Sequence, residues 1–243
     1  MVLTYEDQVR GELRAWEREL MRPPGVLERT SKKVQTKINS LLPEKVTAAL
    51  SAAARGTVKS VLFGMDYVPK GLPQLGLTLE QRDVMAQELL SKYKKIAAAE
   101  GAGAGAGGFV LGLVDFPALI AIKMKLLFEM AHVYGYHTAD YRERLYLLYV
   151  FQLAFSSQEK RTPLLEAVRD WEQTAAKWPV GEGYLEQVDW EQFQREYRDS
   201  IDFRKMMQLV PGIGAVVGAW ANYGLVEDLG TVAIRCFQMR HLE

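Results

Sequence analysis

Apolar residues recur every three or four positions along the first part of the chain, over residues 5–20. This is the period of an amphipathic helix, which has one apolar and one polar face. Thr4 and Asp7 stand three residues apart at its beginning, which is the pattern of an N-terminal capping box. No part of the sequence shows the sustained alternation of apolar and polar residues that predicts a β-strand. The whole chain is therefore expected to be all-α.

Further helices are predicted from similar start and end signals. Thr78 and Gln81 form a second capping box. The segment Tyr141–Phe155 is apolar on nearly all sides, which is typical of a buried helix. Thr162–Pro163 is expected to begin the next helix, which continues to Ala175. Other helices are expected over Val26–Leu42, from Pro43 onward, over Tyr184–Arg204 and over Met206–Arg240. The sequence thus predicts about eight to ten helices in total.

The most biased part of the sequence is Ala97–Tyr136, which begins with a crowd of glycines. Glycines four residues apart share a helix stripe without side chains, and such pairs are Gly101/Gly105, Gly103/Gly107 and Gly108/Gly112. Each glycine costs a helix about 1 kcal/mol relative to alanine, so this many require a partner helix that gains from close contact. The expected partner is Pro211–Asn222, which contains Gly214 and Gly218. Two glycine-rich helices are therefore predicted at the centre of the fold.

Residues 103–108 also match the G-x-G-x-x-G letter pattern of a dinucleotide-binding turn. That turn requires a β-strand before its first glycine, whereas residues 93–100 are mostly strong helix formers. The phosphate-binding pattern G-x-x-x-x-G-K-[ST] is absent from the sequence. The glycines therefore favour close helix packing, and no nucleotide cofactor is expected.

Asp115 and Pro117 indicate that a new helix begins after the glycines. Aspartate is a favoured N-cap residue, proline is favoured in the first turn, and Gly135 suits the position just after a helix end. These signals predict a helix from Asp115 to Gly135. A functional alternative is that Asp115 and Glu100 are carboxylates beside a glycine-lined cleft that holds a cation, a lipid head group or water.

Catalytic and metal-binding motifs are absent from the rest of the chain, which has no H-E-x-x-H, no G-x-S-x-G and no Cys/His cluster. His132 is expected in the core or at a helix end, and Cys236 is expected to be a buried thiol. Tyr136 could stack on a ligand, although aromatic residues at helical spacing usually belong to a core. No catalytic residue, metal site or cofactor is predicted. The candidates for contact with a ligand or partner are Glu100, Gly101, Gly105, Gly108, Asp115, Pro117, His132, Tyr136, Gly214, Gly218 and Asn222.

The charge balance excludes one class of partner. Lysine and arginine number 30, as do aspartate and glutamate, so the chain has no net field that would attract nucleic acid. One cysteine cannot form a disulfide within the chain, and the first residues lack a secretory leader. A cytoplasmic location is therefore expected. A peripheral position at the inner face of the cell membrane is compatible with it.

Two apolar segments approach the character of a membrane-spanning helix. Residues 108–122 contain Asp115 and Pro117 and are shorter than the roughly twenty apolar residues that a span requires. Residues 206–226 are long enough, but Pro211, polar residues and several glycines weaken their hydropathy. Two interpretations stay open: the glycine-rich helices form a permanent core, or they contact or enter a membrane.

Several of these motifs together resemble the bacterial EcsC protein family. They are Tyr5-Glu6, Trp16-Glu17, Leu42-Pro43-Glu44-Lys45-Val46, the block from Glu100 to Gly108, Val114-Asp115-Phe116-Pro117-Ala118-Leu119, Tyr134-Gly135-Tyr136, the block from Pro211 to Ala219, and Asn222-Tyr223. The resemblance extends over nearly the whole chain and implies one EcsC-like helical domain over residues 1–243. The family's founding member is encoded beside an ABC transporter that affects protein secretion. The family's biochemical activity is unknown, so no catalytic residue can be transferred.

The resulting function hypothesis is a non-catalytic accessory protein, associated with a membrane or a membrane complex and linked to transport or secretion. Its glycine-rich helices would contact lipid or a membrane protein. The main alternative is a hydrolase-like enzyme or a small-ligand-binding protein with a buried cleft near Glu100 and Asp115. A third possibility is a soluble scaffold that binds no small ligand.

Overall fold

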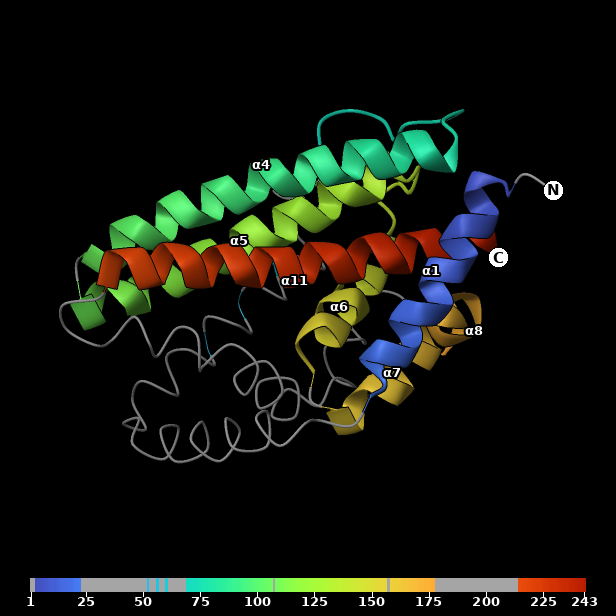
Figure 1. Ribbon diagram of the computed structural model, residues 1–243. Coiled ribbons are helices and arrows are strands. Elements are labelled where there is room, and N and C mark those ends of the chain that lie inside the picture. Colours follow the sequence, from blue (N-terminus) through green and yellow to red (C-terminus); the bar gives the residue numbers. More distant parts are fainter. Residues whose placement is uncertain are drawn as a thin grey trace.

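The computed structural model describes residues 3–22, 52, 56, 60, 69–106, 108–156, 158–177 and 214–243, without the side chains of residues 104–106, 108–117, 158, 159, 214–218 and 221. These ranges hold seven helices and no strand (Figure 1): α1 (Tyr5–Leu20), α4 (Leu79–Ala106), α5 (Gly108–Val133), α6 (Tyr141–Phe155), α7 (Gln158–Arg169), α8 (Trp171–Ala176) and α11 (Gly214–Leu242). The predicted all-α fold is confirmed for the described part of the chain.

Three long helices, α4, α5 and α11, run side by side along the molecule (Figure 1), and α4 is antiparallel to the other two. The most extensive contact between any two helices joins α4 and α11. Their contacts keep one register, because each step forward along α4 is matched by an equal step back along α11. The contacts join Asp83 with Gln238, Leu90 with Gly230, Lys94 with Glu227 and Glu100 with Asn222. The α4–α11 pair is therefore the axis of the fold.

The shorter helices gather around the C-terminal half of α11. α6 packs against α11 and α7, and α1 lies across α11 and α4. Figure 1 shows α1, α7 and α8 together near the C-terminus, far from the first residues of α11. The two ends of α11 therefore have different surroundings.

The two predicted capping boxes are confirmed. The side chain of Thr4 accepts a hydrogen bond from the backbone N–H of Asp7, and the Asp7 carboxylate accepts one from the backbone N–H of Thr4. The Thr78 hydroxyl likewise accepts from the backbone N–H of Gln81 at 3.3 Å, and Gln81 Oε1 accepts from the backbone N–H of Thr78 at 3.0 Å. Each box satisfies two backbone donors that would otherwise have no partner, so α1 and α4 begin where the sequence predicts.

The predicted end of α5 at Gly135 is also confirmed. Gly135 has a φ of 94°, which a residue with a side chain rarely adopts. Its N–H donates to the carbonyl of His132 at 3.1 Å, and the N–H of Tyr136 donates to the carbonyl of Ala131 at 2.8 Å, which is the Schellman arrangement. A Cβ at position 135 would also lie 3.0 Å from Nη1 of Arg82. The positive φ therefore favours glycine here, and a side chain would also crowd the Arg82 guanidinium.

The predicted start of α5 at Asp115 is wrong. α5 begins at Gly108, so Asp115 and Pro117 lie inside a continuous helix rather than at its N-cap and first turn. Capping and proline signals act over one turn and are worth about 1 kcal/mol for a cap. A helix that packs along α4 and α11 can outweigh them, because most helical stability in proteins comes from tertiary packing.

The predicted start of the helix at Thr162–Pro163 is wrong for the same reason. α7 begins at Gln158, and Pro163 lies inside it. The predicted single helix to Ala175 is two helices in the structure, because α7 ends at Arg169 and α8 begins at Trp171. Pro163 is the sixth residue of α7, beyond the first four N–H groups that have no partner within the helix, so its missing N–H removes one internal hydrogen bond of α7.

Some predicted helices cannot be compared with the structure. Val26–Leu42, the helix from Pro43, Tyr184–Arg204 and residues 206–213 lie outside the described residues. The total of eight to ten helices therefore stays a prediction, as does the single domain.

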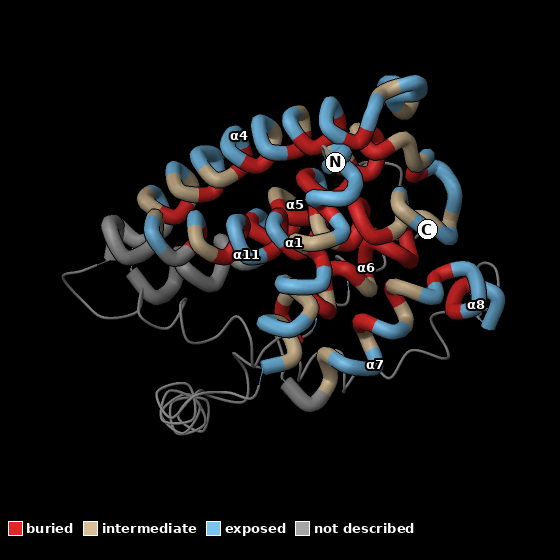
Figure 2. The backbone as a smooth tube through the Cα atoms, turned by 45° about the vertical axis from the view of Figure 1, so that its right-hand side comes forward, coloured by how far each residue is buried: buried red, intermediate tan, exposed pale blue. Residues whose placement is uncertain are grey.

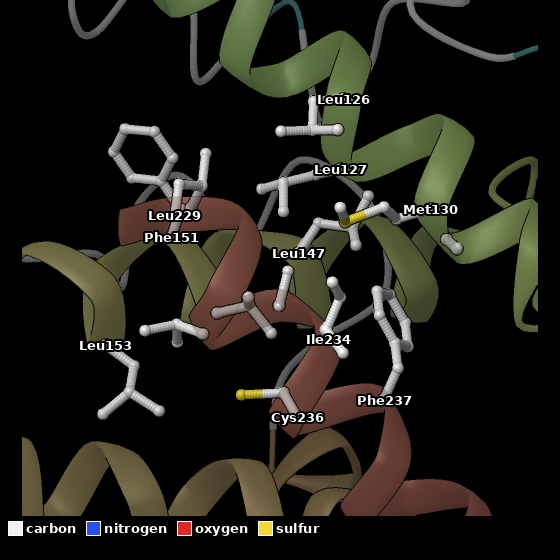
Figure 3. Packing of buried hydrophobic residues seen from close by; sticks show 14 of the residues in the cluster. Leu126, Leu127, Met130, Leu147, Phe151, Leu153, Leu229, Ile234, Cys236 and Phe237 are labelled. Carbon is white, nitrogen blue, oxygen red and sulfur yellow. The ribbon is translucent and has the colours of Figure 1, made fainter. Parts of the chain in front are cut away.

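The core lies where α5, α6 and the second half of α11 meet. Figure 2 shows buried backbone along the inner sides of α4, α5 and α11 and along α6. Nine of the residues of α6 are buried, which confirms the prediction that this helix is surrounded by protein. Figure 3 shows side chains of the three helices packed together, among them Leu126, Leu127, Met130, Leu147, Phe151, Leu153, Leu229, Ile234, Cys236 and Phe237.

Candidate functional site

Uncharged segments of three helices meet at one end of the molecule, at the left of Figure 1. α4 ends there with residues 101–106, α5 begins there with residues 108–114, and α11 begins there with residues 214–221. None of the three segments contains a charged residue. We call these segments the glycine-rich end. The predicted contact residues that lie in it or border it are Glu100, Gly101, Gly105, Gly108, Asp115, Pro117, Gly214, Gly218 and Asn222.

One hydrogen bond closes the base of the glycine-rich end. Asn222 of α11 is fully buried, and its Nδ2 donates to Oε2 of Glu100 on α4 over 2.6 Å. Gly101, the next residue of α4, is also buried. α4 and α11 are therefore in contact at this point, whereas close packing of their glycine stripes stays a prediction. The side-chain surroundings of Asp115 lie outside the described residues, so a cleft shared by Glu100 and Asp115 stays a prediction.

Exposed aromatic residues lie in the glycine-rich end, at Trp220, and next to it, at Tyr223. Trp220 is 66% exposed and Tyr223, one turn further along α11, is 37% exposed. Lys94 of α4 lies with its Nζ 4.8 Å from the centre of the Tyr223 ring and 3.0 Å from Oε1 of Glu227. The hydrogen bond to Glu227 raises the pKa of Lys94, although partial burial acts in the opposite direction. The ammonium group is therefore held in place, whereas the Trp220 side chain faces solvent.

A tight contact between α4 and α11 occurs at a glycine that the sequence pattern did not single out. A Cβ at Gly230 would lie 2.3 Å from Cδ1 of Leu90, which is far inside van der Waals contact. Gly103, in the conspicuous glycine stretch, has no atom within 4 Å of the same position and is exposed. Gly230 is an isolated glycine among larger residues, so its spacing carries no signal in the sequence.

His132 and Tyr136 lie at the opposite end of the bundle from the other candidates. His132 is buried, and its Nε2 lies 3.1 Å from the hydroxyl of Thr138. Burial lowers the pKa of His132, and the neighbouring His137 lowers it further. Tyr136 stacks on Phe237 with 5.7 Å between ring centres. Both residues therefore serve the packing at the end of α5 in this structure, which agrees with the core role expected for His132.

The same end of the bundle holds a strong ion pair. Arg240 of α11 donates two hydrogen bonds to Glu143 of α6, at 2.6 and 2.8 Å. Its guanidinium also lies over the rings of Tyr136 and Tyr146, at 4.1 and 4.7 Å from their centres. Burial alone would lower the pKa of Arg240, but its hydrogen bonds to Glu143 outweigh that effect and raise it. Four side chains thus fix the C-terminal end of α11.

A buried carboxylate links three helices and the end of a fourth. Asp83 of α4 is 5% exposed and accepts hydrogen bonds from Tyr5 at 2.8 Å, from Gln238 at 2.8 Å and from Tyr134 at 2.5 Å. Burial, together with the nearby Asp83, raises the pKa of both tyrosines, which keeps them as donors. Arg235 continues the network, since it donates to the carbonyl oxygen of the Gln238 side chain at 2.9 Å.

Sequence reasoning missed this network, although one signal for Asp83 was present. Asp83 lies on the stripe of α4 that carries the buried residues of that helix, which are Leu79, Ala86, Leu90, Tyr93 and Ala97. A carboxylate on the apolar stripe of a helix must find donors inside the protein. The identity of those donors depends on which helices lie beside α4, and the sequence does not contain that information in any local pattern.

A cavity of about 400 Å³ lies beside Asp83, between α1, α4 and α11. The polar side chains that line it include Tyr5, Glu12, Asp83, Glu88, Arg235 and Gln238. Glu12 of α1 accepts a hydrogen bond from Arg235 of α11 at 2.9 Å, so an ion pair forms part of the wall. A cleft was expected near Glu100, but this cavity lies at the opposite end of α4.

The described residues offer no metal site and no reactive thiol. No group of three or more His, Cys, Asp or Glu side chains suited to a metal ion occurs among them. Cys236 is buried, and burial raises its pKa, as expected for an inert thiol. Of the helices that the structure describes, none combines the length and the apolar character needed to cross a membrane.

Comparison with known proteins identifies the family. The family model of the EcsC protein family matches residues 7–242. Protein EcsC of Bacillus subtilis (strain 168) is 40% identical over 228 residues, which cover 94% of this chain and 92% of that protein. Uncharacterized protein YdbA of the same organism is 26% identical over 161 residues, which cover 66% of this chain and 58% of that protein. No solved structure matches. The chain belongs to the EcsC protein family.

Proposed function

We propose that this protein is a non-catalytic accessory protein that works at the inner face of the cell membrane and contacts lipid or a membrane protein through its glycine-rich end. The observation that carries the proposal is the convergence of the uncharged segments of α4, α5 and α11 at one end of the bundle. These segments are far apart in the sequence. Together they form a charge-free end on a protein in which a quarter of all residues are charged.

The length of the uncharged segments matches the depth to which surface-bound helices enter a membrane. On α4 the nearest charge is Glu100, six residues from the end at Ala106, and on α5 it is Asp115, seven residues from the start at Gly108. At a rise of about 1.5 Å per residue, both distances are about 10 Å. Helices that bind at a membrane surface bury their apolar parts about 5–10 Å into the boundary between head groups and acyl chains. The end thus has the dimensions for shallow contact, without crossing the bilayer.

Trp220 and Tyr223 support the same orientation. Trp220 lies in the uncharged start of α11, six residues or about 9 Å from Gly214, and Tyr223 follows it one turn later. Tryptophan and tyrosine are enriched at the level of lipid head groups, because one part of each ring is apolar and another is polar. The link to transport and secretion rests on the family resemblance alone.

Flotation with liposomes tests this proposal. Purified protein is mixed with vesicles of neutral or anionic lipid, and the fraction that rises with the vesicles is measured. Wild-type protein is expected to float, and Trp220→Glu is expected to reduce the bound fraction about tenfold, because a carboxylate is costly at the interface. Leu75→Glu is the matched control, since Leu75 is 81% exposed and precedes the start of α4, at the opposite end of that helix.

The outcomes separate lipid from protein contact. Protein that stays off pure lipid but floats with native inner-membrane vesicles, in a manner that depends on Trp220, has a membrane-protein partner. Protein that stays in the soluble fraction with every vesicle would contradict the proposal. Equal binding of the wild type and Trp220→Glu would show that the contact lies elsewhere on the molecule.

A further inference from the structure

The cavity between α1, α4 and α11 has the size of a small-molecule site and a mostly polar lining. Its volume of about 400 Å³ lies within the usual range of ligand pockets, which is about 300–1,000 Å³. Apolar surface comes from Val84 and Ile234, and polar groups converge from all three helices. The cavity is distinct from the glycine-rich end, so it can be tested independently of the proposed membrane contact.

Asp83 is a buried carboxylate that lacks a counter-charge. Its three hydrogen bonds come from Tyr5, Tyr134 and Gln238, all of which are uncharged donors. No ion pair of Asp83 occurs in the described structure, in which the side chain is only 5% exposed. Buried charges in proteins are generally paired, because removal from water is costly. The arrangement holds a negative charge at the cavity and leaves it without a cation.

One acceptor position on Asp83 is still available. A carboxylate can accept about four hydrogen bonds, two at each oxygen. Oδ2 accepts from Tyr5 and from Gln238, whereas Oδ1 accepts from Tyr134 alone. Asp83 lines the cavity together with Tyr5 and Gln238, so a cation in the cavity lies beside a carboxylate that still has capacity for one more hydrogen bond.

The cavity as a whole carries an excess of negative charge. The charged side chains that line it are Glu12, Asp83 and Glu88, opposed by Arg235 alone, which leaves two negative charges in excess. Arg235 is engaged by Glu12 and Gln238, so it is not available to neutralise Asp83. Glu88 stands exposed at the rim and forms no ion pair within the described residues. A concave surface of one sign concentrates ligands of the opposite sign.

We propose that this cavity binds a primary alkylammonium group, whose N–H donors reach Asp83 and whose alkyl stem lies along Val84 and Ile234. Glu88 at the rim attracts the cation, and Tyr5 contributes an aromatic wall. The ammonium group belongs either to a free small amine or to a lysine side chain of another protein. Both sources share the same chemistry, and calorimetry with one probe for each source distinguishes them.

Isothermal titration calorimetry on the full chain tests the proposal at pH 7 and low salt. n-Butylammonium chloride is expected to give saturable binding with a Kd of about 1 mM or tighter. Tetramethylammonium has the same charge but no N–H donor, and it should bind at least about tenfold more weakly. Tighter binding of Nα-acetyl-lysinamide than of n-butylammonium indicates a lysine side chain, and the reverse order indicates a free amine.

Variants of the lining locate the binding. Asp83→Asn removes the buried charge and should weaken binding about tenfold or more. Because Asp83→Asn alters a folded network, Glu88→Gln and Thr231→Trp provide tests at exposed positions of the lining. Glu88→Gln should weaken binding about threefold, and the bulky Thr231→Trp should block it. The control is Glu166→Gln, which removes an exposed carboxylate from α7, a helix that does not line the cavity, and should leave the Kd unchanged.

Three results would overturn the proposal. The first is the absence of saturable ammonium binding by protein that circular dichroism shows to be folded. The second is unchanged binding by Thr231→Trp, which would place the ligand outside this cavity. The third is equal binding of tetramethylammonium and n-butylammonium, which would remove the role of the N–H donors.

Discussion

The two ends of the α4–α11 pair differ in polarity. At one end, Asp83 and Gln238 belong to a hydrogen-bond network that also includes side chains of α1 and of the segment after α5. At the other end, Glu100 and Asn222 form one hydrogen bond, and beyond it residues 101–106 and 214–221 contain no charged side chain. The same two helices thus change from a polar, hydrogen-bonded part to an uncharged part along their length.

This difference indicates which part of the bundle sets the register of the two helices. Directional hydrogen bonds permit one register only, since a shift by one residue would leave buried polar groups without partners. Small residues permit close approach but specify register weakly, because they offer no group that must be matched. The polar end therefore sets the register of α4 and α11, and the glycine-rich end is the part to which we assign the proposed contact with lipid or a membrane protein.

The largest expected effect is a loss of stability when an ion pair near the polar end is broken. Arg240→Met removes one partner of a pair in which both side chains are mostly buried, and it leaves Glu143 without its cation. The free energy of unfolding is expected to fall by about 3 kcal/mol, as for other buried pairs that lose one partner. Urea denaturation measures this change.

The matched control replaces both partners of that pair. Arg240→Met combined with Glu143→Leu should recover much of the lost stability, because no charge is then left buried. A double variant as unstable as Arg240→Met alone would indicate that the packing of Arg240 on Tyr136 and Tyr146, and not its charge, is what matters.

An intermediate effect compares two glycines on the facing helices. Gly230→Ala places a Cβ 2.3 Å from the buried Leu90 side chain, and overpacking of this kind costs about 1–3 kcal/mol. Gly103→Ala meets no atom within 4 Å and should instead stabilise α4, by up to about 1 kcal/mol, through its better helix propensity. Chemical denaturation of both variants should therefore give changes of opposite sign. The same sign for both would contradict the view that close contact occurs at Gly230 and not at Gly103.

The smallest expected effect is a pH dependence confined to the polar end. Hydrogen bonds from Gln8 and Arg235 lower the pKa of Glu12 below its usual 4.5. Because the pKa is lower in the folded state, this stabilisation is present above pH 4.5 and is lost as the pH falls through the folded value. It should amount to less than about 1 kcal/mol, because water reaches the pair.

Glu12→Gln isolates this contribution. The difference in Tm between the wild type and Glu12→Gln should be largest near neutral pH and shrink below pH 4.5. A difference that stays constant with pH would show that the Glu12–Arg235 pair contributes nothing to the docking of α1. Residues 101–106 and 214–221 contain no titratable side chain, so no comparable dependence is expected from them.

The success of sequence reasoning depended on how far apart the deciding residues are. Thr4 and Thr78 predicted the starts of α1 and α4, and Gly135 predicted the end of α5, because each cap satisfies backbone groups within one turn. Asp115 and Pro163 carried equally good local signals, but the helix starts predicted from them were wrong. In both cases the helix extends further toward its N-terminus, since packing along neighbouring helices outweighs a local preference.

Candidate site residues were found where a local pattern marked them and missed where distant residues decide their role. Glu100 and Asn222 were singled out separately because they border the glycine blocks, and the structure joins them. Asp83 was not singled out at all. Its position on the apolar stripe of α4 was visible in the sequence, but its donors come from residues 5, 134 and 238, which no local pattern connects.

The all-α class, the family and several helix boundaries, such as those at Thr4, Thr78 and Gly135, could be read from the amino-acid sequence. Periodicity and capping act over one or two turns, so they can be read along the chain. Which helices lie together, where Gly230 meets Leu90 and where a cavity opens became known from the three-dimensional structure alone. These features depend on the sum of many contacts between distant segments, and Gly230 against Leu90 is the clearest case.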